Sequence, residues 1–291
     1  MNKLFYLFLV LILSGMKLSG QNSQVLEGLS FHSHILNMER TYSVYLPPGY
    51  HHNDRYYPVL YLLHGSGGDH STWIQSGEVQ TIADNAILSG RVTPMIIVMP
   101  NARERTRGYF NHINGGFDYE DFFFNELIPH IEGTFRCRTR SRYRAISGQS
   151  MGGGGALFYT LHRPDMFSAA APLSAATHSW NREQLIERLI RDEVIDVTDT
   201  QFENYFQRYS VPEILSAADS GQMEALQRVR WYISCGDEDF LYEGNCLLHI
   251  AFRKANIPHE FRIKDGGHTW SYWRKELPFV LEFVSKSFTE F

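Results

Sequence analysis

A serine flanked by glycines lies at the centre of the chain. Residues 148–152 are Gly-Gln-Ser-Met-Gly and match the pattern G-x-S-x-G, with Ser150 in the middle. An apolar run precedes this pentapeptide, and a helix-compatible run at 156–161 follows it. In such a strand-to-helix turn the serine is strained and exposed, and a side chain at either glycine would clash with the turn. The pattern therefore predicts Ser150 as the nucleophile of an acyl transfer.

A serine hydroxyl is a weak nucleophile without a base, and the base is expected among the histidines that follow it in the chain. His268 is the candidate, because it follows the last predicted strand on a loop where Gly266 and Gly267 let the chain turn back. The other four are predicted to lie on helices, at the surface or in packing positions: His162, His178, His249 and His259.

Three carboxylates follow the predicted strand 231–234, in the segment Cys-Gly-Asp-Glu-Asp at 235–239. Only one of them can orient the imidazole of His268 and stabilise its charged form. We take Asp239 as this acid and keep Asp237 as the alternative. The remaining carboxylates are expected to cap the next helix or to face solvent.

Acyl transfer also needs two backbone N–H groups directed at the oxygen on which negative charge develops. Met151 supplies one by its position directly after the nucleophile. The other is assigned to Ser66, on the loop His-Gly-Ser-Gly-Gly at 64–68 that follows an early predicted strand. His64 precedes Ser150, which is the wrong order for the base in this kind of fold, so we predict that it supports the loop.

Short apolar runs alternate with helical patterns along most of the chain. An antiparallel hairpin is predicted at 31–46 and the last strand at 260–263. Buried parallel strands are predicted at 57–63, 95–99, 143–147, 167–173 and 231–234, and helices at 79–88 and 122–135. This order predicts an α/β protein with a doubly wound, mostly parallel sheet, antiparallel N-terminal strands and helices on both faces.

Residues 178–228 interrupt this alternation. They are charged, contain no clear strand, and are predicted to be helical at 182–192 and 201–208. We expect this insert to lie over the carboxyl ends of the strands as a cap.

Composition excludes several classes of partner. The 291 residues carry a formal net charge of −5, with Lys and Arg mixed among Asp and Glu, so neither nucleic acid nor an anionic membrane is an expected partner. A local group of arginines is predicted to lie solvated on one side of an extended segment before a strand: Arg136, Arg138, Arg140, Arg142 and Arg144. No obligate protein partner is indicated.

The cysteines give no metal site, because Cys137, Cys235 and Cys246 lack a second Cys or His at zinc-ligand spacing. Cys235 and Cys246 flank the acid turn, and either a disulfide between them or two buried free thiols fits the sequence.

The N-terminus resembles a signal peptide. Lys3 precedes an apolar run at 4–13 that is too short to span a bilayer well, and small residues follow it. We predict a signal peptide at 1–20, with cleavage near Gly20–Gln21, and a single catalytic domain at 21–291. A retained membrane anchor is the alternative. The prediction implies a secreted or periplasmic protein.

Four motifs in combination resemble the putative-esterase (esterase D-like) family. They are the segments at 42–50, Tyr-Ser-Val-Tyr-Leu-Pro-Pro-Gly-Tyr, and at 63–68, Leu-His-Gly-Ser-Gly-Gly, with Gly-Gln-Ser-Met-Gly-Gly at 148–153 and Gly-Gly-His at 266–268. The resemblance runs from about Thr41 to the C-terminal helix and implies an α/β-hydrolase fold. It also places the nucleophile on Ser150, the base on His268, the acid on Asp239 and the oxyanion donors on Ser66 and Met151. The insert at 178–228 does not match the family pattern.

The resemblance implies a serine carboxylesterase that needs no cofactor. The family includes feruloyl and acetyl xylan esterases, S-formylglutathione hydrolases and mycolyltransferases. Export disfavours a cytosolic thioester, so we expect an ester-substituted plant polysaccharide or oligosaccharide, feruloyl rather than acetyl, with xylan degradation as the context. Trp270 and Gln149 are expected substrate contacts. An acetyl xylan esterase and a secreted acyltransferase remain the alternatives.

Overall fold

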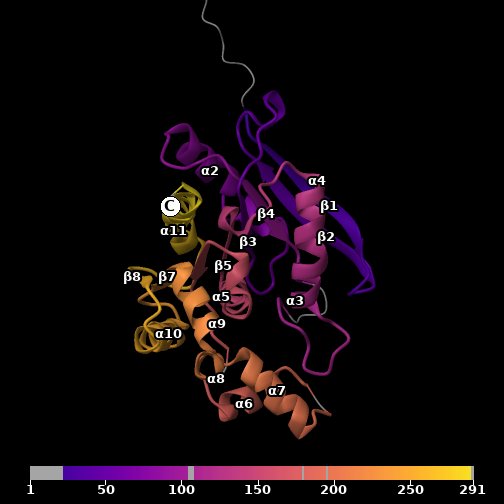
Figure 1. Cartoon of the computed structure of the whole chain (residues 1–291), viewed down its shortest axis with the longest axis vertical. Helices are drawn as coiled ribbons and strands as arrows, with labels where there is room; N and C mark the ends of the chain where they lie inside the picture. Colours follow the sequence, from indigo (N-terminus) through magenta and orange to yellow (C-terminus); the bar gives the residue numbers. More distant parts are fainter. Residues whose placement is uncertain (1–21, 104–107, 179, 195, 290–291) are drawn as a thin grey trace, which may run out of the picture.

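The computed structural model describes residues 22–103, 108–178, 180–194 and 196–289 (Figure 1). The predicted signal peptide at 1–20 lies outside these residues. Within them, no helix combines the length and the apolar character that a membrane crossing requires.

A mixed eight-stranded sheet forms the centre of the described chain, with its strands in the order β1-β2-β4-β3-β5-β6-β7-β8. β2 pairs antiparallel with β1 and β4, and every other pair of neighbouring strands in this sheet is parallel. The strands are β1 Gln24–Ser33, β2 Met38–Leu46, β3 Val59–Leu63, β4 Ile96–Pro100, β5 Arg144–Gln149, β6 Ala169–Leu173, β7 Arg230–Gly236 and β8 His259–Lys264. This is the α/β-hydrolase architecture that the sequence predicts.

Helices cover both faces of the sheet. α2 and α11 pack on one face, and α3, α4, α5, α9 and α10 pack on the other. The helices are α1 Thr72–Gln75, α2 Val79–Leu88, α3 Tyr119–Phe122, α4 Ile128–Thr134, α5 Met151–His162, α6 Arg182–Arg191, α7 Asp199–Tyr209, α8 Val211–Ala217, α9 Ser220–Arg228, α10 Tyr242–Lys254 and α11 Trp270–Thr289.

The central strands are apolar throughout because both of their faces are buried. In β3, Tyr61 and Leu63 join the core on the α5 side, whereas Leu60 and Leu62 join the core on the α11 side. Successive side chains point to opposite faces of a strand, so one short run of residues supplies two hydrophobic layers.

The helix predicted at 122–135 is less regular than expected. It begins earlier, as α3, and passes through a π-helical segment, Phe123–Leu127, before α4. Pro129 has no amide hydrogen to donate one turn back, and the helix widens in the turn before it.

The insert at 178–228 contains α6 to α9 and no strand among its described residues. Figure 1 shows α6, α7 and α8 together beyond one end of the sheet. Three of these helices begin at a residue whose side chain accepts a backbone N–H of the first turn. These N-cap residues are Asn181 for α6, Thr198 for α7 and Asp219 for α9. Only the first part of the insert covers the strand ends, because α9 returns along the body, where Gln222 donates to the Leu161 carbonyl at the end of α5.

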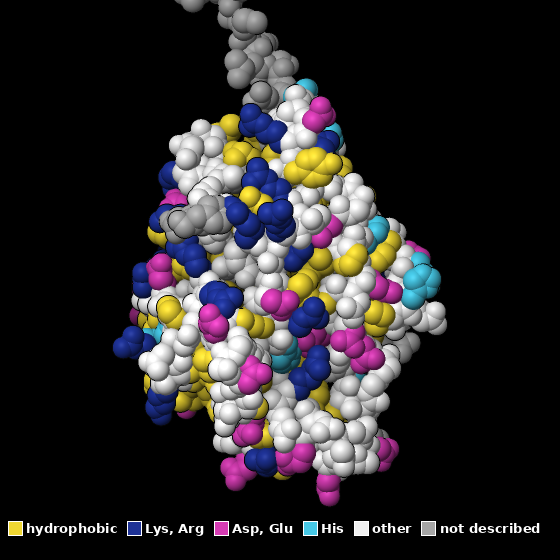
Figure 2. Space-filling view, viewed as in Figure 1, with side chains coloured by type: hydrophobic (Ala, Val, Ile, Leu, Met, Phe, Trp, Pro, Cys, Tyr) yellow, Lys and Arg dark blue, Asp and Glu magenta, His cyan; other side chains and the backbone are white. Residues whose placement is uncertain are grey.

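The prediction of a solvated arginine segment is confirmed for Arg138 and Arg140, which are exposed, and is wrong for Arg144. A 3-10 turn, Ser141–Tyr143, breaks the alternation, and Arg144 is buried in an ion pair with Glu132 at 2.6 Å. The guanidinium of Arg138 lies over the Tyr143 ring, with its carbon 4.6 Å from the ring centroid. Figure 2 shows Lys and Arg side chains gathered on the upper part of the viewed face, with both signs of charge interspersed below.

The three cysteines are free, so the structure has two thiols rather than a disulfide at Cys235 and Cys246. Burial raises the pKa of the Cys137 and Cys235 thiols to about 12.

Candidate active site

Ser150 lies in a strained turn between β5 and α5. Its φ of 58° and ψ of −118° are unusual for a residue with a side chain. A Cβ on Gly152 would stand 2.5 Å from the Leu63 carbonyl oxygen, and one on Gly148 would stand 2.6 Å from the Gly152 carbonyl oxygen. Both glycines are therefore required by close backbone approaches around the serine.

The backbone on both sides of the serine is held by β6 and α5. The Ser150 N–H donates to the Leu173 carbonyl at 3.0 Å, and the Ser150 carbonyl accepts from Gly154 and Ala176. These bonds fix the turn on the neighbouring strand, so the Ser150 hydroxyl projects from a rigid base.

The structure brings the three residues predicted for the triad into hydrogen-bond reach. His268 Nε2 lies 2.9 Å from Ser150 Oγ, and His268 Nδ1 lies 2.8 Å from Asp239 Oδ2. With a hydrogen on Nδ1 donated to the carboxylate, Nε2 is free to accept the serine proton.

Asp239 is fully buried yet held as an anion. Burial raises the pKa of its carboxyl, but hydrogen bonds from His268, the Leu241 N–H and Ser174 outweigh this and bring the pKa below its usual range. Trp273 supports the same group from behind, because its indole N–H donates to Ser174 Oγ at 3.1 Å.

Asp237 is exposed to solvent, as one of the two expectations had it, and it also has a task that was not expected. Its carboxylate accepts the Gly266 N–H at 3.0 Å, and the Glu238 N–H donates to the Gly266 carbonyl at 3.1 Å. Asp237 thus holds the glycine loop that carries His268, instead of capping α10. The carboxylate within reach of the imidazole is that of Asp239.

The loop at 64–68 is braced by His64, as predicted. His64 is buried, its Nε2 accepts the Ala102 N–H at 2.9 Å, and its Nδ1 donates to the Gly65 carbonyl at 2.8 Å. Burial lowers the pKa of His64 to about 4, which keeps the ring neutral and both bonds intact. Gly67, with φ of 75°, lets the loop turn outward beside Ser66.

Two cavities meet at Ser66 on the loop beside the serine. One, of about 470 Å³, is lined by Ser150, His268, Gln149 and Trp270. The other, of about 640 Å³, is bordered by Ser66 and Met151 and extends to the insert. Ser66 lines both cavities, whereas Met151 borders only the larger one, and both predicted substrate contacts border only the smaller one.

Sequence reasoning missed Phe240. It directly follows Asp239, 72% of its surface is exposed, and its ring centroid lies 4.4 Å from that of His268. It also borders the larger cavity. An exposed aromatic ring beside the base suits substrate contact, but its position next to the acid was the only signal that the sequence offered.

The remaining histidines lie away from the serine hydroxyl. His249 and His259 bond each other at 2.7 Å, and His162 bonds Glu120. His178 packs against the rings of Phe110 and Phe158, as expected of a packing residue, and it also lines the larger cavity. Among the described residues, no three His, Cys, Asp or Glu side chains are placed to hold a metal ion.

Comparison with known proteins gives consistent results. The sequence model of the family described as "Putative esterase" matches residues 33–283. A solved structure named ferulic acid esterase is 36% identical, with a TM-score of 0.81, and the match covers 92% of this chain and 100% of that one.

Two curated relatives are similar over part of the chain. An endo-1,4-beta-xylanase/feruloyl esterase of Xylanibacter ruminicola is 36% identical over 53% of this chain and 22% of its own length. An acetyl esterase of Caldicellulosiruptor saccharolyticus is 25% identical over 78% of this chain and 83% of its own. This chain therefore matches only about a fifth of the xylanase relative.

Replacing Asp239 by Asn should lower kcat/KM by about 10³-fold or more, because the amide can hold the wrong tautomer of His268 and cannot stabilise the imidazolium. The matched control is Asp237→Asn, whose amide oxygen can still accept the Gly266 N–H and should leave most activity. Steady-state kinetics of both variants on one ester decides, and a larger loss for Asp237→Asn would contradict the assignment.

Gly152→Ala should abolish activity and destabilise the fold by roughly 1–3 kcal/mol, because the new Cβ meets the Leu63 and His64 carbonyl oxygens. Gly133→Ala in α4 is the control, since nothing lies within 4 Å of its Cβ. That change should leave activity intact and stabilise by up to about 1 kcal/mol. Denaturant unfolding and kinetics measure both, and a fully active Gly152→Ala enzyme would refute the turn geometry.

Proposed function

This chain belongs to the putative esterase family, and we propose that it is a serine carboxylesterase that hydrolyses carbohydrate-linked esters. The observation that carries the proposal is the continuous line of contacts from Ser150 Oγ through His268 to Asp239. Such a line can deprotonate a serine and stabilise the resulting imidazolium, which is what acyl transfer from an ester requires.

In the proposed reaction, Ser150 Oγ attacks the carbonyl carbon while its proton moves to Nε2 of His268. The carbonyl oxygen becomes an oxyanion, to which the N–H groups of Ser66 and Met151 are assigned as donors. His268 then gives its proton to the alcohol oxygen as the C–O bond breaks, leaving an acyl group on Ser150. Water, deprotonated by His268, attacks this acyl-enzyme, and His268 returns the proton to Ser150 Oγ as the acid leaves.

A feruloyl ester on a plant polysaccharide or oligosaccharide is the proposed substrate. The similarity to the ferulic acid esterase supports the acyl group, and the xylanase/feruloyl esterase relative supports the polysaccharide. Gln149 lines the smaller cavity beside Ser150 and His268, and its buried Oε1 has no partner among the described residues, which supports its assignment as a substrate contact. Trp270 and Trp273 line the same cavity with their ring centroids 5.2 Å apart, and the buried Trp73 packs against Trp270 from behind, so a sugar ring can stack on Trp270.

Activity on a small substrate panel tests this proposal. Methyl ferulate should be hydrolysed with a higher kcat/KM than 4-nitrophenyl acetate, acetylated xylan should release little acetate, and a peptide anilide should not react. Ser150→Ala is the control and should lose about 10³-fold or more, because no acyl-enzyme can form. Strong acetate release without ferulate release would instead favour the acetyl esterase, for which the Caldicellulosiruptor relative speaks. Activity limited to emulsified long-chain esters would refute the carbohydrate assignment.

We also propose that residues 1–20 are a signal peptide and that residues 21–291 form the catalytic domain. The apolar run at 4–13 and the small residues after it support this. N-terminal sequencing of protein recovered outside the cytoplasm of a bacterial host should give Gln21 or a nearby residue first. An intact Met1 on protein retained in the membrane fraction would favour the anchor.

A further inference from the structure

We propose that the 640 Å³ cavity beneath the insert holds the acyl part of the ester, a planar aromatic acid, and that Glu120, acting through Tyr209, is a positioning residue for its aromatic wall. This inference rests on the proposed esterase function and adds the place of the acyl group and the element that shapes it.

The two sides of the serine differ in chemistry. His268 must protonate the leaving alcohol, so the sugar departs on the side where His268 and Trp270 line the smaller cavity. The larger cavity shares Ser66 with the smaller one, but Met151 and the insert line only the larger cavity. A substituent on the carbonyl carbon that extends past Met151, away from Trp270, therefore enters the larger cavity.

The far wall of this cavity is aromatic. Phe110, His178 and Tyr205 line it, and the first two come from segments far apart in the chain. All three rings contact Tyr209, with centroid distances of 4.8 Å to Phe110, 5.9 Å to His178 and 4.7 Å to Tyr205. Tyr209 is itself only 2% exposed. It stands behind the wall and supports each of the rings in front of it.

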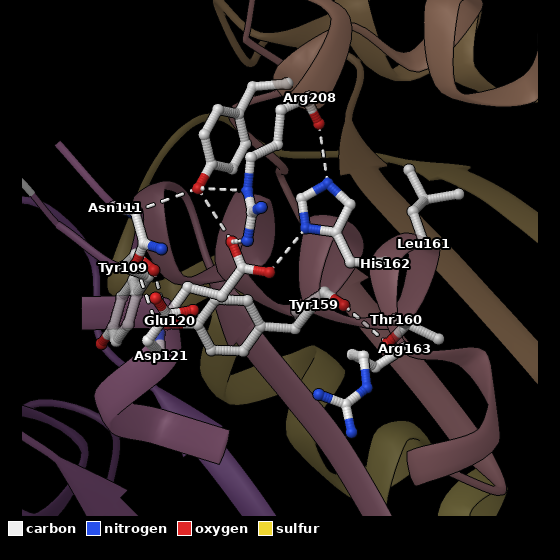
Figure 3. A network of polar contacts seen from close by, with 12 residues as sticks. Tyr109, Asn111, Glu120, Asp121, Tyr159, Thr160, Leu161, His162, Arg163 and Arg208 are labelled. Atoms are coloured by element: carbon white, nitrogen blue, oxygen red, sulfur yellow. Dashed lines mark hydrogen bonds and ion pairs between the residues drawn. The ribbon is translucent and has the colours of Figure 1, made fainter. Parts of the chain in front are cut away.

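Tyr209 is fixed by a buried carboxylate. Figure 3 shows the Glu120 side chain at the centre of a polar network that joins separate elements of the chain. The Tyr209 hydroxyl donates to Glu120 Oε2 at 2.8 Å and accepts the Asn111 N–H at 3.1 Å. Asn111 also lines the cavity. One hydroxyl thus ties the last residue of α7 to α3 and to the loop that carries Phe110.

The network requires Glu120 as an anion. Burial raises the pKa of Glu120, but His162, Arg208 and the Tyr209 hydroxyl outweigh it and bring the pKa below the ordinary value. His162 Nδ1 lies 2.7 Å from Glu120 Oε1, and Arg208 Nη2 lies 3.2 Å from Glu120 Oε2. His162 Nε2 lies 2.7 Å from a second oxygen, the Arg208 carbonyl, so the ring is held from both sides.

These contacts point to a role in selectivity rather than in chemistry. Glu120 connects α5, α7 and the loop at Asn111, whereas the triad stands on turns after β5, β7 and β8. Loosening Glu120 or Tyr209 should displace the wall on which a large acyl group packs. A small acyl group such as acetate does not reach that wall, so its turnover should not depend on it.

The test compares two variants with a matched control. Tyr209→Phe and Glu120→Gln should each lower kcat/KM for methyl ferulate about tenfold relative to 4-nitrophenyl acetate, because a buried bond is lost behind the wall. Tyr232→Phe is the control, since its buried hydroxyl donates to the buried Glu276 at 2.9 Å on the opposite face of the sheet. It should leave the ferulate-to-acetate ratio unchanged even where it lowers the midpoint of thermal unfolding.

A substitution of a residue that lines the cavity tests the inference independently, in case Glu120→Gln folds poorly. His178→Ala changes a lining side chain and should alter the same ratio without altering the preference between methyl ferulate and a feruloylated sugar. An unchanged acyl ratio in both Tyr209→Phe and His178→Ala would overturn the inference, as would a change in alcohol preference alone. A wild-type protein inactive on every ester would refute the proposed function itself, which is a different result.

Discussion

The left-handed backbone at Ser150 is the constraint on which the site depends. A side chain there is tolerated because the turn is fastened to β6 by the Ser150 N–H and by the Ala176 N–H, and because Gly148 and Gly152 leave room for the backbone of β3. The sheet order places β5 between β3 and β6. The loops after β3, β7 and β8 can therefore converge on the Ser150 hydroxyl. β3 pairs directly with β5, and β7 and β8 are joined to β5 through β6.

Two buried carboxylates hold their surroundings in place, and each accepts enough hydrogen bonds to remain charged. Asp239 has an imidazole, a backbone N–H and a serine hydroxyl, and Glu120 has an imidazole, a guanidinium and a phenol. An uncompensated charge in such places would be costly, whereas one with several donors fixes the geometry of all its partners. The first orients the base, and the second orients the insert. Strength of pairing, rather than exposure to water, keeps both groups ionised.

The sequence was sufficient for the parts of the site that follow from backbone geometry. The glycines around Ser150, the apolar strands and the glycine loop before His268 carry local signals, so the strands and the position of each candidate residue could be predicted. Glu120 and Tyr209 carry no such signal, because their partners lie 42 and 89 residues away along the chain. The role of Asp237 was missed for the same reason, and Arg144 because only the fold shows that Glu132 faces it.

Chemistry and selectivity occupy different parts of the chain for a physical reason. The triad requires positions accurate to a fraction of an ångström, and turns anchored on a rigid sheet provide them. A cavity wall needs only to match the shape of its ligand, and helices of an insert can change without disturbing the sheet. Such an insert must still be fixed to the rest of the domain. Ordering a mobile cavity wall on each binding event would cost free energy and weaken substrate binding. The Tyr209 hydroxyl, held by Glu120 and Asn111, is where this chain meets that requirement.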